Sequence, residues 1–414
     1  MGALESRSWI AVKLEIFMMR RFLLSCLILL FAFVPQMRGE EPDTYELLPD
    51  SSNFVIASIV LSSPGEEAFF ALGHSGLRLQ CPTKNLDFCF SYSTVLNLGP
   101  EFNLRLLLGQ MKGGFEALPY DEYMDTFRQT GRGVKEFPLN LTLNEKRELW
   151  RLMDTKIQKG PTQPFDFLYN NCTSTLYHSI ETVMEREDFV YPPLSPLDMR
   201  VRDAFHVLFA DAPWIEFFGI TMLSAIPPDD PCPLELVLCP SLWARLLPEA
   251  TIVGLDGSSR PALSGEPYES AAQTLFVEPT KWTPVLVFAL LLFVAVVVTV
   301  VERVFRWKRV GAVFDGVLFT FYNLFAFYLL YASCIGMYGY FWNWFFFVFN
   351  PLPLLLWLYC RKKGGEARLW LGCSVVLIGF MLFYVVHMSQ FEWAHELLLA
   401  TLLLRCFNRY LAKR

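Results

Sequence analysis

The chain has 414 residues, of which 53% are hydrophobic and 38 are phenylalanine. This apolar content exceeds that of a soluble protein of the same size, so part of the chain is expected to lie in a lipid bilayer. The formal net charge is −6, and no block of lysine and arginine interleaves with aromatic residues outside the apolar segments. Nucleic-acid binding is therefore excluded as the function.

The N-terminal segment, residues 1–39, has the pattern of an export signal. Arg20 and Arg21 precede an apolar run from Phe22 to Val34. This run is short for a membrane span and has the length of a signal-peptide core. No clear small-residue cleavage site follows the run, so the alternative is an uncleaved N-terminal anchor.

Residues 40–250 have ordinary polarity and are predicted to form a mixed α+β domain. Short apolar runs indicate strands, and apolar residues at helical spacing with charges on the opposite face indicate helices. Residues 213–240 are rich in proline and are expected to be irregular, and residues 251–281 are expected to be a linker. The predicted elements are strands at residues 54–61, 76–80 and 88–92, a helix at residues 143–157 and a second helix that begins at residue 172.

Residues 282–408 are predicted to form an all-α transmembrane domain of about five helices. Clusters of arginine and lysine follow the first, third and fifth apolar segments, and the other two connections lack them. Basic clusters mark the cytoplasmic side, so we expect a cytoplasmic C-terminus and a location on the other side of the membrane for residues 40–281, in agreement with the export signal. The predicted spans are residues 282–301, 313–334, 342–359, 369–386 and a segment that ends near residue 404.

The ten cysteines fall into three groups. Five lie in or next to apolar runs, where a small buried hydrophobic residue is expected. Cys81, Cys89, Cys232 and Cys239 form two close pairs in the exported region, and we expect two disulfides, which leave Cys172 as a free thiol. The alternative is a zinc site, but no Cys-x-x-Cys motif or histidine cluster supports it, and no metal or cofactor is expected.

Cys172 and His74 are the candidate catalytic pair. Cys172 follows two asparagines and opens a predicted helix, where backbone N–H groups and the helix dipole favour a thiolate. His74 lies between glycines at the start of a predicted strand. In such a pair the imidazole takes the thiol proton, and the thiolate attacks an ester or amide carbonyl to form a thioester. The alternative for His74 is a packed or surface residue without a catalytic role.

The segments around these two residues resemble a known family. The matching positions are Gly73-His74 with Leu77-Arg78, Phe90-Ser91-Tyr92, Leu108-Gly109, Leu139-Asn140-Leu141-Thr142, Phe165 through Asn170-Asn171-Cys172, Pro213-Trp214 with Gly219, and Asp229. They resemble the circularly permuted papain-like families that include lecithin:retinol acyltransferase. More closely, they resemble the periplasmic domain of the bacterial lipoprotein N-acyltransferase of the Bacteroides type. The similarity covers about residues 50–250, and the spans that follow match that enzyme's architecture.

Two features depart from the family pattern. Tyr92 is followed by Ser93-Thr94 where a glycine is expected, and the segment from Cys232 to Cys239 is peculiar to this chain.

The resemblance implies a permuted papain-like, NlpC-type domain and a reaction between two lipids at the bacterial inner membrane. An acyl chain leaves a phospholipid donor and rests on Cys172 as a thioester. It then passes to the N-terminal cysteine amine of a diacylglyceryl lipoprotein. Because both substrates are anchored in the membrane, this reaction accounts for the attached spans.

Five further residues are candidates for supporting this reaction. The backbone N–H of Cys172 and the amide of Asn170 or Asn171 are candidate oxyanion donors, and Ser91 or Tyr92 is a candidate for orienting the imidazole. For each asparagine the alternative role is a helix cap. Arg78 is a candidate for binding a phosphate or head group, and its alternative role is a structural ion pair.

Two readings from other functional classes stay open. A membrane-tethered cysteine peptidase or amidase that acts on the cell wall uses the same chemistry but cleaves peptides and acquires no lipid label. A non-enzymatic assembly factor or channel predicts that Cys172 is dispensable. The shortage of charged residues within most spans argues against transport.

Overall fold

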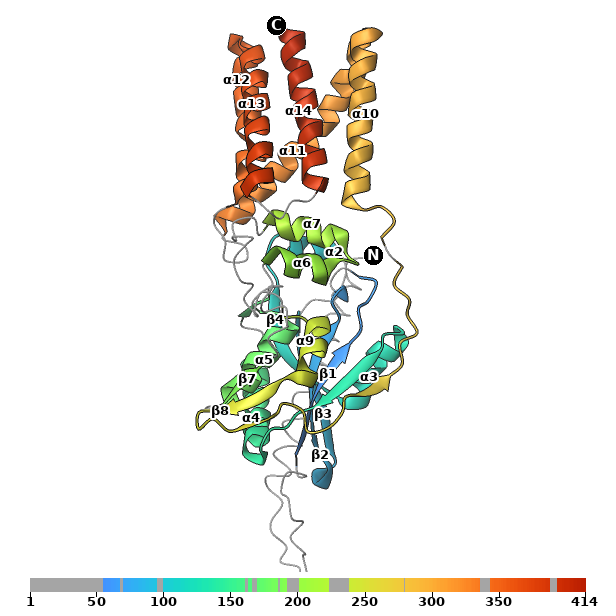
Figure 1. Cartoon of the computed structure of the whole chain (residues 1–414), viewed down its shortest axis with the longest axis vertical. Coiled ribbons are helices and arrows are strands. Elements are labelled where there is room, and N and C mark those ends of the chain that lie inside the picture. The colour runs from blue at the N-terminus through green and yellow to red at the C-terminus, as the bar shows by residue number, and fades with distance from the viewer. Residues whose placement is uncertain are drawn as a thin grey trace, which may run out of the picture. The chain divides into compact units, whose positions relative to one another are not determined.

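The structure is a computed structural model of the whole chain (Figure 1). It describes residues 55–67, 70–94, 100–160, 163–165, 170–184, 187–191, 201–222, 238–278, 280–335, 343–387 and 393–414. The predicted signal peptide or anchor at residues 1–39 and the predicted disulfide partner Cys232 lie outside these described residues.

A seven-stranded antiparallel sheet forms the centre of the α+β domain, with strand order β10, β5, β1, β2, β3, β4, β6. The three predicted strands are confirmed as β1, β2 and β3, with bounds shifted by one or two residues. They are neighbours in the sheet, because Leu77 lies opposite both Ile59 and Phe90. The strands are β1 (Ile56–Ser62), β2 (His74–Cys81), β3 (Leu86–Thr94), β4 (Lys112–Pro119), β5 (Val134–Pro138), β6 (Gln163–Pro164) and β10 (Tyr268–Ala271).

Helices pack on both faces of this sheet. Side chains alternate along a strand, so Leu77 and Phe90 point to one face, where they share a core with Leu176 of α5. Val60 and Cys89 point to the other face and pack with α3. Figure 1 shows α4 and α5 on one side of the strands and α3 on the other. The helices are α3 (Tyr120–Gln129), α4 (Leu143–Lys159) and α5 (Cys172–Val183), so both predicted helices are confirmed.

Two expectations for the second half of this domain are wrong. Residues 251–271 are not a linker, because they contribute β10 to the edge of the large sheet beside β5 and two strands to a three-stranded sheet. Residues 213–222 are not irregular, because Pro213 occupies the first position of a helix, where its missing N–H costs no hydrogen bond. The additional elements are α2 (Pro100–Leu107), β7 (Glu187–Val190), α6 (Val201–Phe209), α7 (Pro213–Met222), α9 (Pro240–Leu246), β8 (Thr251–Gly254) and β9 (Ser259–Pro261).

The predicted disulfide between Cys81 and Cys89 is also wrong, because both are free thiols. Cys81 pairs with Leu86 and Cys89 pairs with Arg78 in the β2–β3 hairpin. The two sulfurs therefore point to opposite faces of the sheet, where no disulfide geometry is possible. Cys239 is likewise a free, buried thiol.

The described residues of the C-terminal part form a bundle of five α-helices, and the prediction of an all-α domain is confirmed. Four helical segments are long and apolar enough to cross a membrane: Pro284–Val304, Lys308–Cys334, Trp344–Lys363 and Glu366–Val386. The helices are α10 (Pro284–Val304), α11 (Lys308–Cys334), α12 (Leu352–Lys363), α13 (Glu366–His387) and α14 (Trp393–Lys413).

The fifth helix, α14, is as long as α10 but carries buried charge. Arg405 is completely buried, and its guanidinium contacts Asp315 of α11 at 2.5 Å and Glu302 of α10 at 2.9 Å. A charge removed from water must be paired, so this cluster ties α10, α11 and α14 together. At the other end of α14, the Nε2 atom of His395 is hydrogen-bonded to the Thr221 hydroxyl of α7, at 2.7 Å.

Candidate active site

Cys172 is the first residue of α5, as the sequence predicts. The preceding residue, Asn171, is the N-cap, and its side-chain oxygen accepts hydrogen bonds from the backbone N–H groups of Thr173 at 2.8 Å and Ser174 at 2.9 Å. This cap satisfies two of the N–H groups that a helix leaves without a partner and fixes the point where the helix begins. The Cys172 side chain is half-buried and its thiol is free.

His74 is the first residue of β2 and lies opposite Ser62 of β1. The chain enters the strand through Gly73, whose φ is +91°, and a Cβ at this position would lie 2.3 Å from the Ser62 carbonyl oxygen. Only glycine fits this entry. The His74 ring is buried between aromatic side chains, with ring centroids 6.4 Å from Phe70 and 6.5 Å from Phe127.

The fold brings the starts of β2 and α5 together. The hydroxyls of Ser75 and Thr173, which follow the two candidate residues in sequence, are 2.8 Å apart and buried. The backbone N–H of Ser75 also faces the Cys172 sulfur. Among the described residues, no hydrogen bond joins the His74 ring to the thiol. The arrangement therefore places both candidates beside one buried contact without a preformed imidazole–thiol bond.

Both groups are neutral near pH 7. Burial, together with the positive charge of Arg132, lowers the pKa of His74 to about 4. Burial also raises the pKa of the Cys172 thiol, although hydrogen bonds from Ser75 and Thr173 act in the opposite direction. Desolvation disfavours the charged form of each group, and here it outweighs the helix terminus that the sequence suggested would favour a thiolate. A neutral imidazole is a competent proton acceptor, so this pair suits general-base activation of the thiol.

The two predicted oxyanion side chains differ in their surroundings. The Asn171 amide is engaged as the helix cap, and its nitrogen donates to the Leu238 carbonyl at 3.4 Å, so the cap role considered for it is the one observed. Asn170 is half-buried next to the cap. The backbone N–H of Cys172 faces the sulfur of the same residue, where an oxyanion beside that sulfur would develop.

Neither Ser91 nor Tyr92 is hydrogen-bonded to His74. Ser91 donates to the Glu116 carboxylate at 3.1 Å on the neighbouring strand β4. Tyr92 points to the opposite face of the sheet, where its ring stacks on Phe165 with centroids 6.0 Å apart.

Arg78 is held in an ion-pair network. Its guanidinium donates to Asp87 at 2.6 and 2.8 Å and to the fully buried Glu136 at 3.1 Å. Glu136 also accepts hydrogen bonds from Tyr268 at 2.8 Å and from Ser270 at 2.5 Å. The structural ion pair considered for Arg78 is therefore present.

Arg132 is a site residue that the sequence reading missed. Its side chain is 4% exposed and donates to the Ser62 hydroxyl at 2.6 Å and the Ser63 carbonyl at 3.0 Å. Its guanidinium lies over Phe70 and Phe127, the two rings that flank His74, at 4.7 and 5.1 Å. No carboxylate of the described residues is within ion-pair distance of it.

The positive charge of Arg132 lowers the pKa of His74 and interacts with the Cys172 group. Burial lowers the pKa of Arg132, and the neighbouring Tyr123 and Cys172 groups oppose this shift. The sequence contained a local sign that the backbone around Arg132 is constrained, because Arg132 stands between two glycines. Gly131 has a φ of +66°, and a Cβ at Gly133 would lie 2.9 Å from the Gln273 side chain.

Tyr123 of α3 is a second residue that was missed. A Cβ at Gly76 would lie 2.5 Å from the Tyr123 hydroxyl oxygen and 2.7 Å from the Cys89 sulfur, so glycine at this position makes room for both. Burial raises the pKa of Tyr123, which therefore stays a neutral phenol.

The described residues contain no group of three or more histidine, cysteine, aspartate or glutamate side chains placed to hold a metal ion. The described residues of the candidate site offer a thiol, an imidazole, backbone N–H groups and one buried cation.

Two family models match the chain. Residues 49–201, which contain both His74 and Cys172, match the family model described as the Lnb N-terminal periplasmic domain. Residues 277–414, which contain α10 to α14, match the model described as the Lnb transmembrane domain. The chain belongs to the Lnb family. No curated protein and no solved structure matches the chain.

Membership of the Lnb family identifies a membrane protein with a periplasmic N-terminal domain. It supports a function in lipoprotein N-acylation in general terms. Both Lnb models occur in one chain and in the order periplasmic domain, then transmembrane domain.

Proposed function

We propose that this Lnb-family protein is a lipoprotein N-acyltransferase that works through a thioester on Cys172. The observation that carries the proposal is a free, half-buried thiol at the start of α5, beside the strand that begins with His74, inside the match to the Lnb periplasmic domain. The adjoining transmembrane domain suits a reaction whose two substrates are both lipids.

In the first step, the Cys172 sulfur attacks an ester carbonyl of a phospholipid. The thiol proton passes to the His74 imidazole as the carbon–sulfur bond forms, and the carbonyl oxygen becomes an oxyanion near the Cys172 backbone N–H. The carbon–oxygen bond to the glycerol then breaks. The leaving oxygen takes the proton from the imidazolium, so a lysophospholipid leaves and an acyl thioester stays on the enzyme.

In the second step, the α-amine of a diacylglyceryl-cysteine attacks the thioester carbonyl. The carbon–nitrogen bond forms and the carbon–sulfur bond breaks. One amine proton passes through His74 to the departing sulfur, which restores the thiol and the neutral imidazole. The product is an amide, which is more stable than the thioester, so the transfer is favourable once water is kept out of the site.

Arg132 supplies the fixed positive charge in this scheme. A cation close to the thiol stabilises the thiolate during attack and disfavours protonation of His74, because like charges repel. It acts through these two groups, so its proposed role is that of a positioning residue. We also propose that the C-terminus is cytoplasmic, because basic clusters lie at the C-terminal ends of α10, α12 and α14.

The experiment is a two-stage labelling assay on the purified full-length protein. Incubation with acyl-labelled phospholipid and no acceptor should place the label on Cys172, and neutral hydroxylamine should remove it, because thioesters react with this nucleophile and amides do not. Addition of a diacylated lipopeptide with a free α-amine should move the label to the peptide. Prior N-acetylation of that peptide should block the transfer.

Two variants serve as controls in this assay. Cys172→Ser should lose the hydroxylamine-labile label, because a hydroxyl is far less ionised than a thiol and an oxygen ester is not cleaved under these conditions. Cys334→Ser, which changes an exposed free thiol in the membrane domain, should label like the wild type. Active protein that takes no lipid label but cleaves cell-wall peptides would instead identify a cysteine peptidase.

A further inference from the structure

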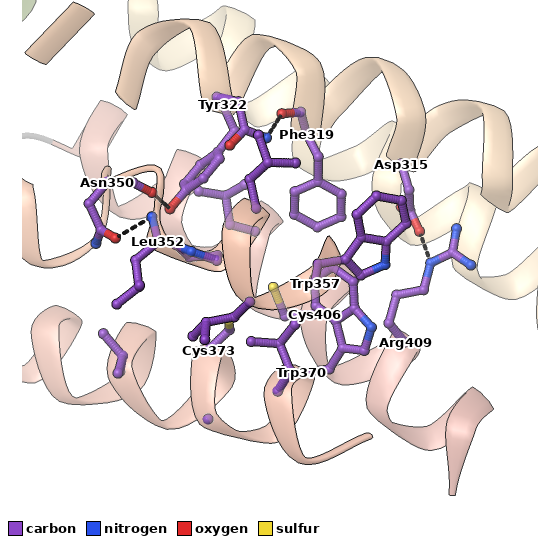
Figure 2. Close-up of a pocket in the computed structure, with 18 of the residues that line it drawn as sticks. Asp315, Phe319, Tyr322, Asn350, Leu352, Trp357, Trp370, Cys373, Cys406 and Arg409 are labelled. Atoms are coloured by element: carbon purple, nitrogen blue, oxygen red, sulfur yellow. Dashed lines mark hydrogen bonds and ion pairs between the residues drawn. The ribbon is translucent and has the colours of Figure 1, made fainter. Parts of the chain in front are cut away.

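The membrane domain contains a long cleft that the proposed reaction does not use. It lies between α11, α12, α13 and α14 and has a volume of about 1320 Å³. Apolar side chains dominate its lining, and they include the aromatic residues Phe319, Phe327, Phe347, Trp357 and Trp370. Figure 2 shows Trp357 and Trp370 near the Asp315–Arg409 ion pair at one end, and Asn350 and Leu352 at the other.

The end of the cleft that contains Arg409 is cationic. Four basic side chains line it, Arg361, Arg368, Arg409 and Lys413, against two carboxylates, Asp315 and Glu366. Arg409 pairs with Asp315, and Lys413 pairs with Glu366 at 2.8 Å.

The remaining two cations, Arg361 and Arg368, have no carboxylate within ion-pair distance among the described residues. Both are exposed at the ends of α12 and α13 that face each other across a short turn. The Arg361 guanidinium lies over the Trp357 ring at 5.4 Å, so it is directed toward the cleft. A cleft that is lined by apolar side chains and has two guanidinium groups without a carboxylate partner at one end is complementary to an anionic amphiphile.

We infer that this cleft binds one anionic phospholipid, with its acyl chains along the aromatic lining and its phosphate at Arg361 and Arg368. The acyl chains contact the apolar side chains that line the cleft, and the phosphate receives charge-assisted hydrogen bonds. The site involves neither Cys172 nor His74. It is therefore independent of the proposed acyl transfer and can fail or hold separately from it.

Two glycines allow the cleft to be filled without disturbing the helices. Gly316 of α11 and Gly372 of α13 line the cleft, and a Cβ at either position would meet no atom within 4 Å. Leucine is also a better helix former than glycine, so each replacement is tolerated by the backbone. Gly379, two turns further along α13, has the same open surroundings but does not line the cleft, which makes Gly379→Leu a matched control.

The test is native mass spectrometry of the full-length protein after exchange into detergent with phosphatidylglycerol or phosphatidylcholine. The wild type should retain one phosphatidylglycerol and bind it about 10-fold more tightly than phosphatidylcholine, because the choline cation of phosphatidylcholine offsets its phosphate charge at the two guanidinium groups. The Arg361→Gln/Arg368→Gln variant should lose this preference. Gly316→Leu and Gly372→Leu should weaken the binding of both lipids, and Gly379→Leu should bind them like the wild type.

Four results would overturn the inference. The first is equal binding of the two lipids by the wild type, and the second is undiminished lipid retention in both cleft-filling variants. The third is a dimer without lipid, because a second copy of the chain would then cover the cleft. Displacement of phosphatidylglycerol by inorganic phosphate would likewise show that the charge alone is bound and that the apolar cleft is not occupied.

Discussion

Replacing Arg132 by methionine isolates the electrostatic part of the proposed mechanism. Arg132 is buried, donates to the Ser62 hydroxyl and Ser63 carbonyl, and lies on the rings of Phe70 and Phe127. Methionine keeps an unbranched apolar side chain against the two rings and removes only the charge and the donors. The thiol of Cys172 should then become harder to ionise.

The size of the effect follows from the surroundings of the charge. Arg132 is almost fully buried, so solvent screens it poorly, and the carboxylate of Glu67 acts on it without an ion-pair contact among the described residues. A nearby opposite charge shifts a pKa by about 1 to 3 units, and the lower bound corresponds to about 1.4 kcal/mol. We therefore expect the pKa of Cys172 to rise by about one unit, the low end of this range, and the thiolate fraction near pH 7 to fall about 10-fold.

The assay is the rate of Cys172 alkylation by iodoacetamide as a function of pH, read by mass spectrometry of the peptide that contains it. No lipid substrate is needed, so the measurement is independent of turnover. Arg132→Lys should keep most of the shift because it keeps the charge. Arg128→Met, which removes an exposed arginine paired with Asp125 on the same face of the domain, should leave the profile unchanged.

A folded Arg132→Met protein with the wild-type alkylation profile would refute the reasoning. Folding is checked by thermal unfolding, since loss of the two hydrogen bonds to Ser62 and Ser63 also costs stability. A loss of activity without a change in the Cys172 profile would assign Arg132 a purely structural role.

Three further predictions concern the site and its supports. Because burial lowers the pKa of His74 to about 4, the imidazole stays neutral below its ordinary value of 6.5, and kcat/KM should fall on the acid side only as the pH approaches about 4; a limb near 6.5 would contradict the buried, neutral base. Asn171→Ala should lower the free energy of unfolding by about 1 kcal/mol, because α5 loses its cap, and an unchanged thermal unfolding midpoint would argue against that role. Gly76→Ala should destabilise the domain by about 1 to 3 kcal/mol through contact with Tyr123 and Cys89, and Tyr123→Phe in the same chain should recover part of the loss if the hydroxyl is the obstacle.

Local patterns in the sequence were sufficient for the elements that carry the candidate pair. The run of residues 172–183 begins after an asparagine that caps it, and a capping box of Thr142 and Glu145 opens α4, so both helix starts depend on neighbours within three residues. The apolar runs of β1, β2 and β3 and of the membrane helices are equally local signals. These patterns placed His74 at the start of a strand and Cys172 at the start of a helix.

Contacts between distant segments decided the rest. The pairing of β10 with β5 joins residues separated by more than half of the domain. The polar turn around residue 257 therefore has the composition of a linker in the sequence, although it connects two paired strands in the structure. The register of β2 against β3 puts Cys81 and Cys89 on opposite faces, which close spacing in sequence cannot reveal.

Charge and burial were also decided by tertiary structure. Arg132 reaches the rings beside His74 only because α3 packs on that face of the sheet and returns the chain to β1. A helix start favours a thiolate in isolation, but the pKa of Cys172 depends on the solvent that the surrounding fold excludes. The residue types of the site are a property of the sequence, whereas its protonation state is a property of the packed structure, because desolvation depends on every segment that covers the site.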